Sequence, residues 1–301
     1  MKRQAAALFA ILLLATPAGA ASIDEVRKAY DGGDFAVAFT EARQLAEAGD
    51  VAAMTLLGIM YRNGQGTEVD TDVAIDWLSR AAEKNDAEAQ LALGVIYLDE
   101  AAGRFDFDQG QSLVRRAAEA GNAEAQFNMG LLMAGAFGNP PEFTLAANWF
   151  RKSAAQGHAG ALYNLGVFYL EGKGVEANAI EAAKLLGSAA EKGNPDAMLD
   201  YGVLVFRGEG VQQDEKIGAQ WLLLAAKRGN IIAQNRVARL YAFGKGVPAN
   251  GVEAMKWNIL ATRGGRADAE LDTMLAQLSD AEKAEAQKLA DAFKPVEVKI
   301  K

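Results

Sequence analysis

The sequence offers few residues for proton transfer, nucleophilic attack or metal binding. It contains one histidine, His158, and no cysteine. His158 lies between two helical patterns, at a place where comparable joints have Asn or Asp, so a capping or solvated role is expected. Neither a Gly-x-Ser-x-Gly nor a His-Glu-x-x-His motif occurs. Carboxylate pairs such as Glu41/Glu47 and Asp280/Glu282 fall at positions expected to be solvated. We therefore expect no catalytic residue, no metal site and no cofactor.

Repeated Gly-x-Gly motifs raise the question of phosphate binding. They follow no predicted strand and lack a third glycine, and Gly244-Lys245 is not followed by Ser or Thr, so neither nucleotide-binding fingerprint is met. We interpret them as turns between helices. The motifs are Gly64/Gly66, Gly172/Gly174, Gly208/Gly210 and Gly244/Gly246.

The elements that position these residues repeat every 36 residues, as from Ala53 to Ala89. A fixed period of this size with two helical patterns per unit predicts an all-α solenoid of stacked helix pairs. A bulky column on the second helix of each pair is expected to fill the core, not to stack on a ligand. The alanine column is Ala53, Ala89, Ala125, Ala161, Ala197, Ala233 and Ala269, and the bulky column is Trp77, Leu113, Trp149, Leu185, Trp221 and Trp257.

The turns within and between the helix pairs contain residues that mark where helices begin and end. In the first full unit, helix A is predicted over about Val51 to Arg62 and helix B over about Asp72 to Lys84. Glycine or Asn85 follows each helix B, where a left-handed residue ends a helix, and the next residue is a predicted N-cap. A glycine also recurs inside helix A, as at Gly58. Because this glycine is costly in a helix, we expect it to allow close approach of helix B and its Ala-Ala pairs.

The start of the chain has the pattern of a secretory signal. Lys2 and Arg3 precede an apolar run from Ala5 to Ala15, and small residues follow, so cleavage is expected after Ala20 or Ala21. Removing Lys2 and Arg3 leaves 29 basic and 39 acidic residues, a formal charge of −10. We expect an exported protein of the periplasm or outside the cell, with no nucleic-acid partner and no membrane insertion after cleavage.

These patterns divide the chain into four parts. Residues 1–20 are the expected signal peptide and residues 22–50 an N-terminal capping helix pair. Residues 51–268 form six 36-residue repeats, and residues 269–301 form closing helices and a charged tail. Capping pairs that depart from the repeat are expected at both ends of a solenoid, because their outer faces meet water.

The repeat pattern Ala-x(4)-Gly-x-x-Tyr-x-x-Gly-x-Gly-Val, followed by Trp or Leu, an Ala-Ala pair and Gly-Asn or Gly-Asp, resembles Sel1-like repeats of the tetratricopeptide superfamily. The resemblance covers about Val51 to Asp268. It implies a right-handed α/α superhelix that binds other proteins, and exported bacterial members include envelope regulators and assembly factors of secretion machinery. One cysteine-rich branch is linked to β-lactam binding, an activity that is not carried over to this cysteine-free chain.

A polar column at the fourth position of helix A is the strongest candidate for a binding site. The column changes along the chain from apolar to charged, and related positions lie seven residues further on the same face. We predict that this face is a concave groove for a partner protein, the alternative being a merely solvated stripe. The column is Leu56, Ala92, Asn128, Asn164, Asp200 and Arg236, and the predicted binding residues also include Glu171 and Arg207.

Four phenylalanines in the irregular loops of the second and third units form a second candidate. They are either an exposed aromatic patch for a partner or a glycan, or local core over helix ends. The overall prediction is a non-enzymatic scaffold, adaptor or regulator in the bacterial cell envelope. The alternatives are a binder of envelope glycan or peptidoglycan fragments and, last, a hydrolase without a recognisable motif. The phenylalanines are Phe105, Phe107, Phe137 and Phe143.

Overall fold

The computed structural model describes residues 21–296 of this chain. The predicted signal peptide, residues 1–20, and the end of the charged tail lie outside the described residues. The chain divides into two compact units, the first ending at Ala120 and the second beginning at Gly121, and each is described by itself. No strand occurs among the described residues, so the all-α prediction is confirmed.

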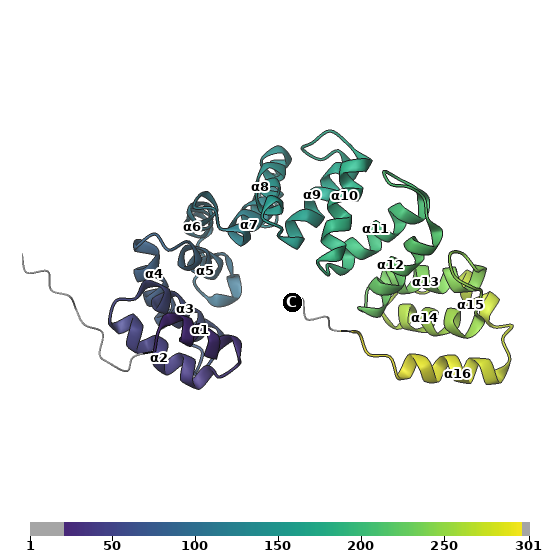
Figure 1. The fold of residues 1–301 in the computed structure, drawn as a ribbon, viewed down its shortest axis with the longest axis horizontal. Helices are drawn as coiled ribbons and strands as arrows, with labels where there is room; N and C mark the ends of the chain where they lie inside the picture. The colour runs from purple at the N-terminus through teal and green to yellow at the C-terminus, as the bar shows by residue number, and fades with distance from the viewer. Residues whose placement is uncertain (1–20, 297–301) are drawn as a thin grey trace, which may run out of the picture. The chain divides into compact units, whose positions relative to one another are not determined.

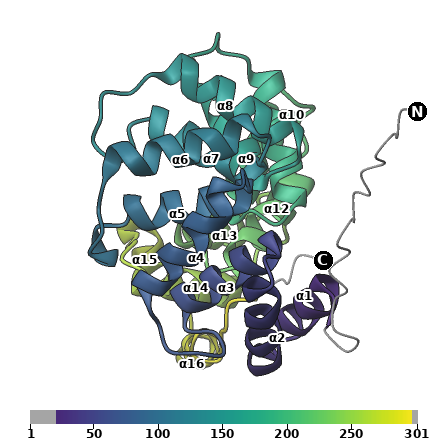
Figure 2. The same ribbon diagram turned by 90° about the vertical axis from the view of Figure 1, so that its left-hand side faces the viewer.

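Unit 1 consists of three helix pairs (Figure 1). The capping pair α1 and α2 packs next to α3 (Figure 2). A short 3₁₀-helix, Glu100–Ala102, replaces the Gly-x-Gly turn of the second repeat. The helices are α1 (Ile23–Asp31), α2 (Phe35–Glu47), α3 (Val51–Asn63), α4 (Thr71–Glu83), α5 (Ala87–Leu98) and α6 (Phe107–Glu119).

Unit 2 continues the same alternation of helices A and B and ends in a shorter pair (Figure 1). The last two helices differ from the repeat because α15 has only 7 residues. The helices are α7 (Ala123–Met133), α8 (Phe143–Ala155), α9 (Ala159–Glu171), α10 (Ala179–Glu191), α11 (Pro195–Arg207), α12 (Glu215–Lys227), α13 (Ile231–Phe243), α14 (Gly251–Arg263), α15 (Ala269–Leu275) and α16 (Asp280–Asp291).

Local capping chemistry fixes where the helices begin and end. Each predicted N-cap of a helix A accepts a hydrogen bond from a backbone amide of that helix, as Asn194 does from Ala197 over 2.8 Å. From α2 to α14, the second residue after each helix B has a positive φ, and Asn85, at φ 63°, is the only non-glycine with one among the described residues. These sequence predictions are confirmed, because a cap depends on only a few neighbouring residues.

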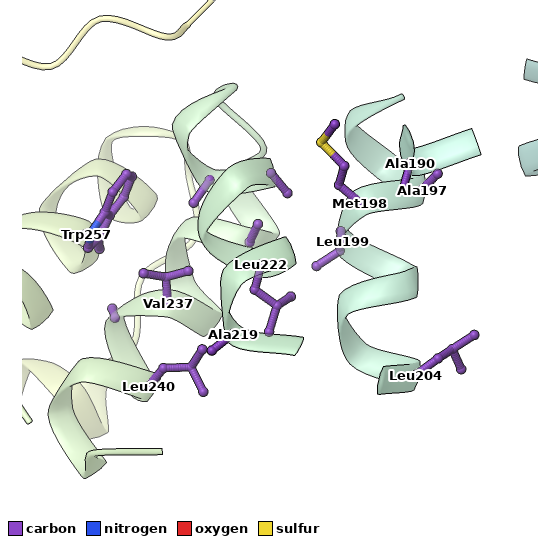
Figure 3. Packing of buried hydrophobic residues seen from close by; sticks show 14 of the residues in the cluster. Ala190, Ala197, Met198, Leu199, Leu204, Ala219, Leu222, Val237, Leu240 and Trp257 are labelled. Carbon is purple, nitrogen blue, oxygen red and sulfur yellow. The ribbon is translucent and has the colours of Figure 1, made fainter. Parts of the chain in front are cut away.

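The glycine inside helix A faces one large side chain of helix B. A methyl group added at Gly166 would lie 2.8 Å from Leu186 Cγ, so only glycine permits this helix spacing. Close approach was predicted correctly, but the contact is made by this large residue and not by the Ala-Ala pair. The facing pairs are Gly58 and Leu78, Gly94 and Val114, Gly130 and Phe150, Gly166 and Leu186, and Gly202 and Leu222. Figure 3 shows Leu222 with its buried neighbours.

The bulky column is only partly in the core, which corrects the sequence interpretation. Trp257 is buried, at 1% exposure, but Trp77, Trp149 and Trp221 are half-buried. The residue after each of these tryptophans is the one that packs against the glycine of helix A. One residue turns a helix by about 100°, which is why a repeated aromatic column lies at the edge of the core and its successor at the centre.

The second glycine of each Gly-x-Gly turn joins one repeat to the preceding one. In unit 2, Gly174, Gly210 and Gly246 lie against the backbone carbonyl of the first residue of the helix B before them. All three have a positive φ, between 65° and 72°. The turn is therefore both a local bend and a contact between repeats, which a side chain at this glycine would obstruct.

The last repeat is joined to α15 by a network around Asp268, the N-cap of that helix. The carboxylate of Asp268 accepts hydrogen bonds from Arg239 Nε over 2.8 Å, from Asn235 Nδ2 over 2.9 Å and from the Leu271 amide over 3.2 Å. Burial alone would raise the pKa of Asp268, but the bonds from Arg239 and Asn235 outweigh it and lower that pKa. The ionised carboxylate thus stabilises the closing helices.

We expect Asp268→Asn to lower the free energy of unfolding by about 1–2 kcal/mol at pH 7, because the charged hydrogen bonds to Asp268 are lost. The loss is limited because asparagine can still cap the helix and because solvent weakens the ion pair with the partly exposed Arg239. Because the folded pKa is below the unfolded value of about 3.9, this contribution is complete above that pH. It is lost as pH falls through the lower folded value. Urea unfolding at several pH values measures it; a wild-type advantage that persists unchanged well below pH 4 would contradict this account.

Candidate partner-binding site

The predicted binding residues of helix A lie on one face of unit 2, here called the A-helix face: Asn128 of α7, Asn164 of α9, Asp200 of α11 and Arg236 of α13. Asn128, Asn164 and Asp200 are half-buried, and Arg236 is exposed. Asn164 Nδ2 donates to the Gly160 carbonyl of its own helix over 2.9 Å. This amide therefore already donates one hydrogen bond within its own helix.

Tyr163 and Asp200 form a half-buried hydrogen bond between α9 and α11. Burial raises the pKa of Tyr163, and the nearby negative charges of Asp200 and Asp196 raise it further. The pKa of Asp200 is raised mainly by burial and also by Asp196, while its hydrogen bond with Tyr163 and the charge of Arg236 oppose the rise. Asp200 is thus a carboxylate whose charge is poorly compensated in this part of the fold.

Arg236 is a cation whose charge is also poorly compensated. Partial burial of its guanidinium lowers the pKa of Arg236 most, repulsion from Arg207 and Arg266 lowers it further, and only Asp200 raises it. Among residues 21–296, its guanidinium forms no salt bridge and donates no hydrogen bond. Since a guanidinium carries five donors and remains charged at any physiological pH, the A-helix face presents a cation with unused hydrogen-bonding capacity.

A small pocket lies directly beside this cation. Its volume is about 200 Å³. Its apolar wall comes from α11, α12 and α13, and its rim is made of arginines. The lining residues are Val203, Phe206, Leu222 and Leu240, together with Arg207, Arg236 and Arg239.

The three arginines of the pocket differ in their partners. Arg207 lies 3.4 Å from a carboxylate oxygen of Glu209. Arg239 pairs with Asp268, as described above, and with Glu270 over 2.9 Å. Arg236 thus differs from the other two, because each of them forms a salt bridge and Arg236 has only the longer-range attraction of Asp200.

The structure brings only part of the predicted site together. Arg236 interacts electrostatically with both Asp200 and Arg207. Glu171, at the end of α9, forms a salt bridge of 2.7 Å with Lys173 in the following turn. Asn128 lies on α7, two repeats before Asp200.

Sequence reasoning missed the apolar pocket wall and Arg239. Arg239 follows Arg236 by three residues, a spacing that places both on one side of a helix and was a usable signal. The apolar residues gave no such signal, because their periodicity is that of ordinary core.

Two of the four phenylalanines lie in helices and not in loops. Phe107 and Phe143 are the first residues of α6 and α8 and are half-buried. Phe143 packs edge-on against Phe168, with 5.8 Å between ring centroids, which agrees with the alternative of local core. Phe105 and Phe137 are 47% and 45% exposed and belong to different units.

His158 caps α9, as expected. Its Nδ1 accepts a hydrogen bond from the Ala161 amide over 3.1 Å, and its Nε2 lies 2.8 Å from Glu124 Oε2. The contact with His158 lowers the pKa of Glu124. The ring is also tilted against Phe127, with 4.5 Å between centroids. All of these contacts are structural.

We expect His158→Ala to lower the free energy of unfolding by about 1 kcal/mol, the usual value of an N-cap. His158→Asn should restore most of this loss, because asparagine caps α7, α11 and α13 at the same position. Thermal unfolding of the three proteins tests this directly. Equal losses for Ala and Asn would show that the stacking on Phe127 matters more than the cap.

Neither a metal site nor a membrane span is found in the part of the chain that the structure describes. No three His, Asp or Glu side chains there are grouped so that they could hold a metal ion. No helix within residues 21–296 combines the length and apolarity needed to cross a bilayer.

Comparison with known proteins begins with the repeats. The Sel1 repeat model matches six consecutive segments, residues 51–86, 87–122, 123–158, 159–194, 195–230 and 231–265. This chain belongs to the Sel1 repeat family. Sel1 repeat proteins are in general protein-interaction scaffolds and are typically non-catalytic.

Two solved Sel1 repeat structures resemble the chain. A Sel1 repeat protein from Oxalobacter formigenes is 29% identical, with a TM-score of 0.73, over 81% of this chain and 100% of that one. The protein c5321, a protective antigen of uropathogenic Escherichia coli with a Sel1-like repeat fold, is 26% identical, with a TM-score of 0.56, over 90% of this chain and 68% of that one. A comparison with curated proteins gives no match.

Proposed function

We propose that this Sel1 repeat protein is a non-enzymatic adaptor or regulator of the bacterial cell envelope that binds a segment of a partner protein on the A-helix face of unit 2. The location follows from the signal pattern of residues 1–20. Membership of the Sel1 repeat family supports a role in binding other proteins. The observation that carries the site is Arg236, which lies beside an apolar pocket and forms no salt bridge within residues 21–296.

A binding surface of this kind suits protein recognition. Interface hot spots are enriched in arginine and in apolar anchors that fill pockets. The pocket on α11, α12 and α13 supplies apolar wall and arginine within one unit.

Site-specific photo-crosslinking in cells tests the proposal. The reactive group is placed at Arg207, which lines the pocket, and at Glu191, an exposed residue at the end of α10, as control. We expect a discrete protein adduct from position 207 only. An adduct from both positions or from neither, in a protein that is exported and folded, would contradict the assignment of this face.

Binding to envelope glycan is the alternative. It relied partly on the loop phenylalanines, and the packing of Phe143 against Phe168 removes one of them. Sedimentation of the purified protein with isolated cell wall distinguishes the two functions, because a protein adaptor remains in the supernatant. Fractionation of cells that express the full chain tests export separately.

A further inference from the structure

The pocket beside Arg236 has the size of a single side chain. Sites for small-molecule ligands usually enclose roughly 300–1,000 Å³, whereas this pocket has about 200 Å³. Val203, Phe206, Leu222 and Leu240 form its apolar wall. An occupant gains free energy here by burying an apolar group, at about 25 cal/mol per Å² of surface removed from water.

The arginines that line the pocket determine which chemical group can bind next to that apolar group. Arg207 and Arg239 already have carboxylate partners, Glu209 for the first and Asp268 and Glu270 for the second. Arg236 is repelled by Arg207 and Arg266, is attracted only by Asp200, and donates no hydrogen bond within the described residues. A planar carboxylate matches a guanidinium in a two-bond geometry, which is stronger than a bond between neutral groups. The rim is therefore suited to a carboxylate.

The net negative charge of the whole chain does not prevent a carboxylate from binding at Arg236. The formal net charge is −8, and an acidic partner is repelled at long range. At physiological ionic strength, however, charges further apart than about 8 Å are largely screened. The contact at Arg236 is short-range, and the apolar pocket beside it adds attraction that does not depend on charge.

From these features we infer that the pocket binds an acidic peptide segment, in which an Asp or Glu carboxylate pairs with Arg236 while an adjacent large apolar side chain enters the space between α11, α12 and α13. This inference rests on the proposed function and names the chemistry of the partner segment. It also assigns a role to Asp200, whose carboxylate lies close enough to influence both Arg236 and any incoming anion.

The test is a selection of displayed peptides on the purified protein. The library holds eight randomised residues inside a longer chain, so that no free terminal carboxylate is available. We expect enrichment of peptides that carry an acidic residue next to a large apolar one. The strongest peptide is then synthesised with amidated and acetylated ends, and its affinity is measured by fluorescence anisotropy.

Four variants define the contribution of each group. Arg236→Gln is expected to weaken binding roughly tenfold or more, the usual effect of losing a charged hydrogen bond, and Val203→Glu to abolish it by placing a charge in the pocket. Asp200→Asn is expected to strengthen binding because a competing carboxylate is removed. Arg115→Gln, which changes an exposed arginine of α6 in unit 1, is the matched control and leaves binding unchanged. Circular dichroism confirms that each variant is folded.

Three outcomes would overturn the inference: no enrichment at all, enriched peptides without acidic residues, or equal affinity for the wild type and Arg236→Gln. The crosslinking experiment at position 207 keeps the two proposals apart. An adduct that forms equally well in Arg236→Gln leaves the adaptor function in place and removes the acidic segment. Absence of any adduct, with acidic peptides still bound, removes the cellular role and keeps the chemistry of the pocket.

Discussion

Gly174→Ala is expected to lower the free energy of unfolding by about 2–5 kcal/mol. Two costs combine in this estimate: roughly 1–2 kcal/mol for a left-handed alanine and about 1–3 kcal/mol for forcing an atom into occupied space. Gly174 has a φ of 65° and lies against the Phe143 carbonyl and the Thr144 amide nitrogen. The added methyl group meets backbone on the preceding repeat, which a side-chain rotation does not relieve.

Gly172 provides a matched control within the same turn. Its φ is 67°, and its nearest neighbour beyond the turn's backbone would be Ala177 Cβ at 3.5 Å from an added methyl group. Gly172→Ala therefore bears the conformational cost alone, about 1–2 kcal/mol. Urea denaturation followed by circular dichroism compares the two. If both variants lose the same stability, the contact between repeats is not what the second glycine provides.

Phe150→Ala is expected to cost about 3–5 kcal/mol, the range for removing a buried aromatic side chain. Phe150 is 0% exposed, faces Gly130 and packs edge-on against Phe168 at 5.5 Å between centroids. Phe150→Leu should cost less than about 1.5 kcal/mol, because leucine occupies the corresponding positions 186 and 222.

Trp149→Ala is the companion experiment. Trp149 is half-buried, and Lys152 Nζ lies 4.0 Å from the centre of its ring, so its loss exposes less core than the loss of Phe150. We expect a clearly smaller decrease in the midpoint of urea unfolding than for Phe150→Ala. A larger decrease would restore the interpretation that the tryptophan column is the centre of the core.

The sequence predicted those parts of the fold that depend on a few neighbouring residues. Asn194 and Gly193 mark a helix boundary by capping chemistry alone, and the period of 36 places each boundary in turn. The choice between Trp149 and Phe150 was harder, because both recur in register and both are aromatic. Only the way α8 is rotated against α7 decides which one faces Gly130, and that residue is Phe150.

The candidate site was less predictable from the sequence, because it also depends on how helices pack against one another. Arg236 and Asp200 were identified as a polar column, but the pocket depends on how α11, α12 and α13 leave a space between Phe206, Leu222 and Leu240. The volume of such a pocket is the small space left between closely packed side chains of three helices. No short stretch of sequence therefore indicates it. The hydrogen bond from Asn164 to Gly160 was likewise hidden, since an amide in a helix can turn back to its own backbone.

The contact of the second turn glycine with the preceding helix B affects how the number of repeats can change during evolution. Gly174, Gly210 and Gly246 each meet the same backbone atom one repeat earlier. Loss of residues 159–194 by recombination would place Gly210 against the Phe143 carbonyl and Pro195 directly after the capping His158, a junction chemically equivalent to the one it replaces. Arrays of this kind can therefore change length in whole repeats, while a gain or loss of any other number of residues breaks the register at once.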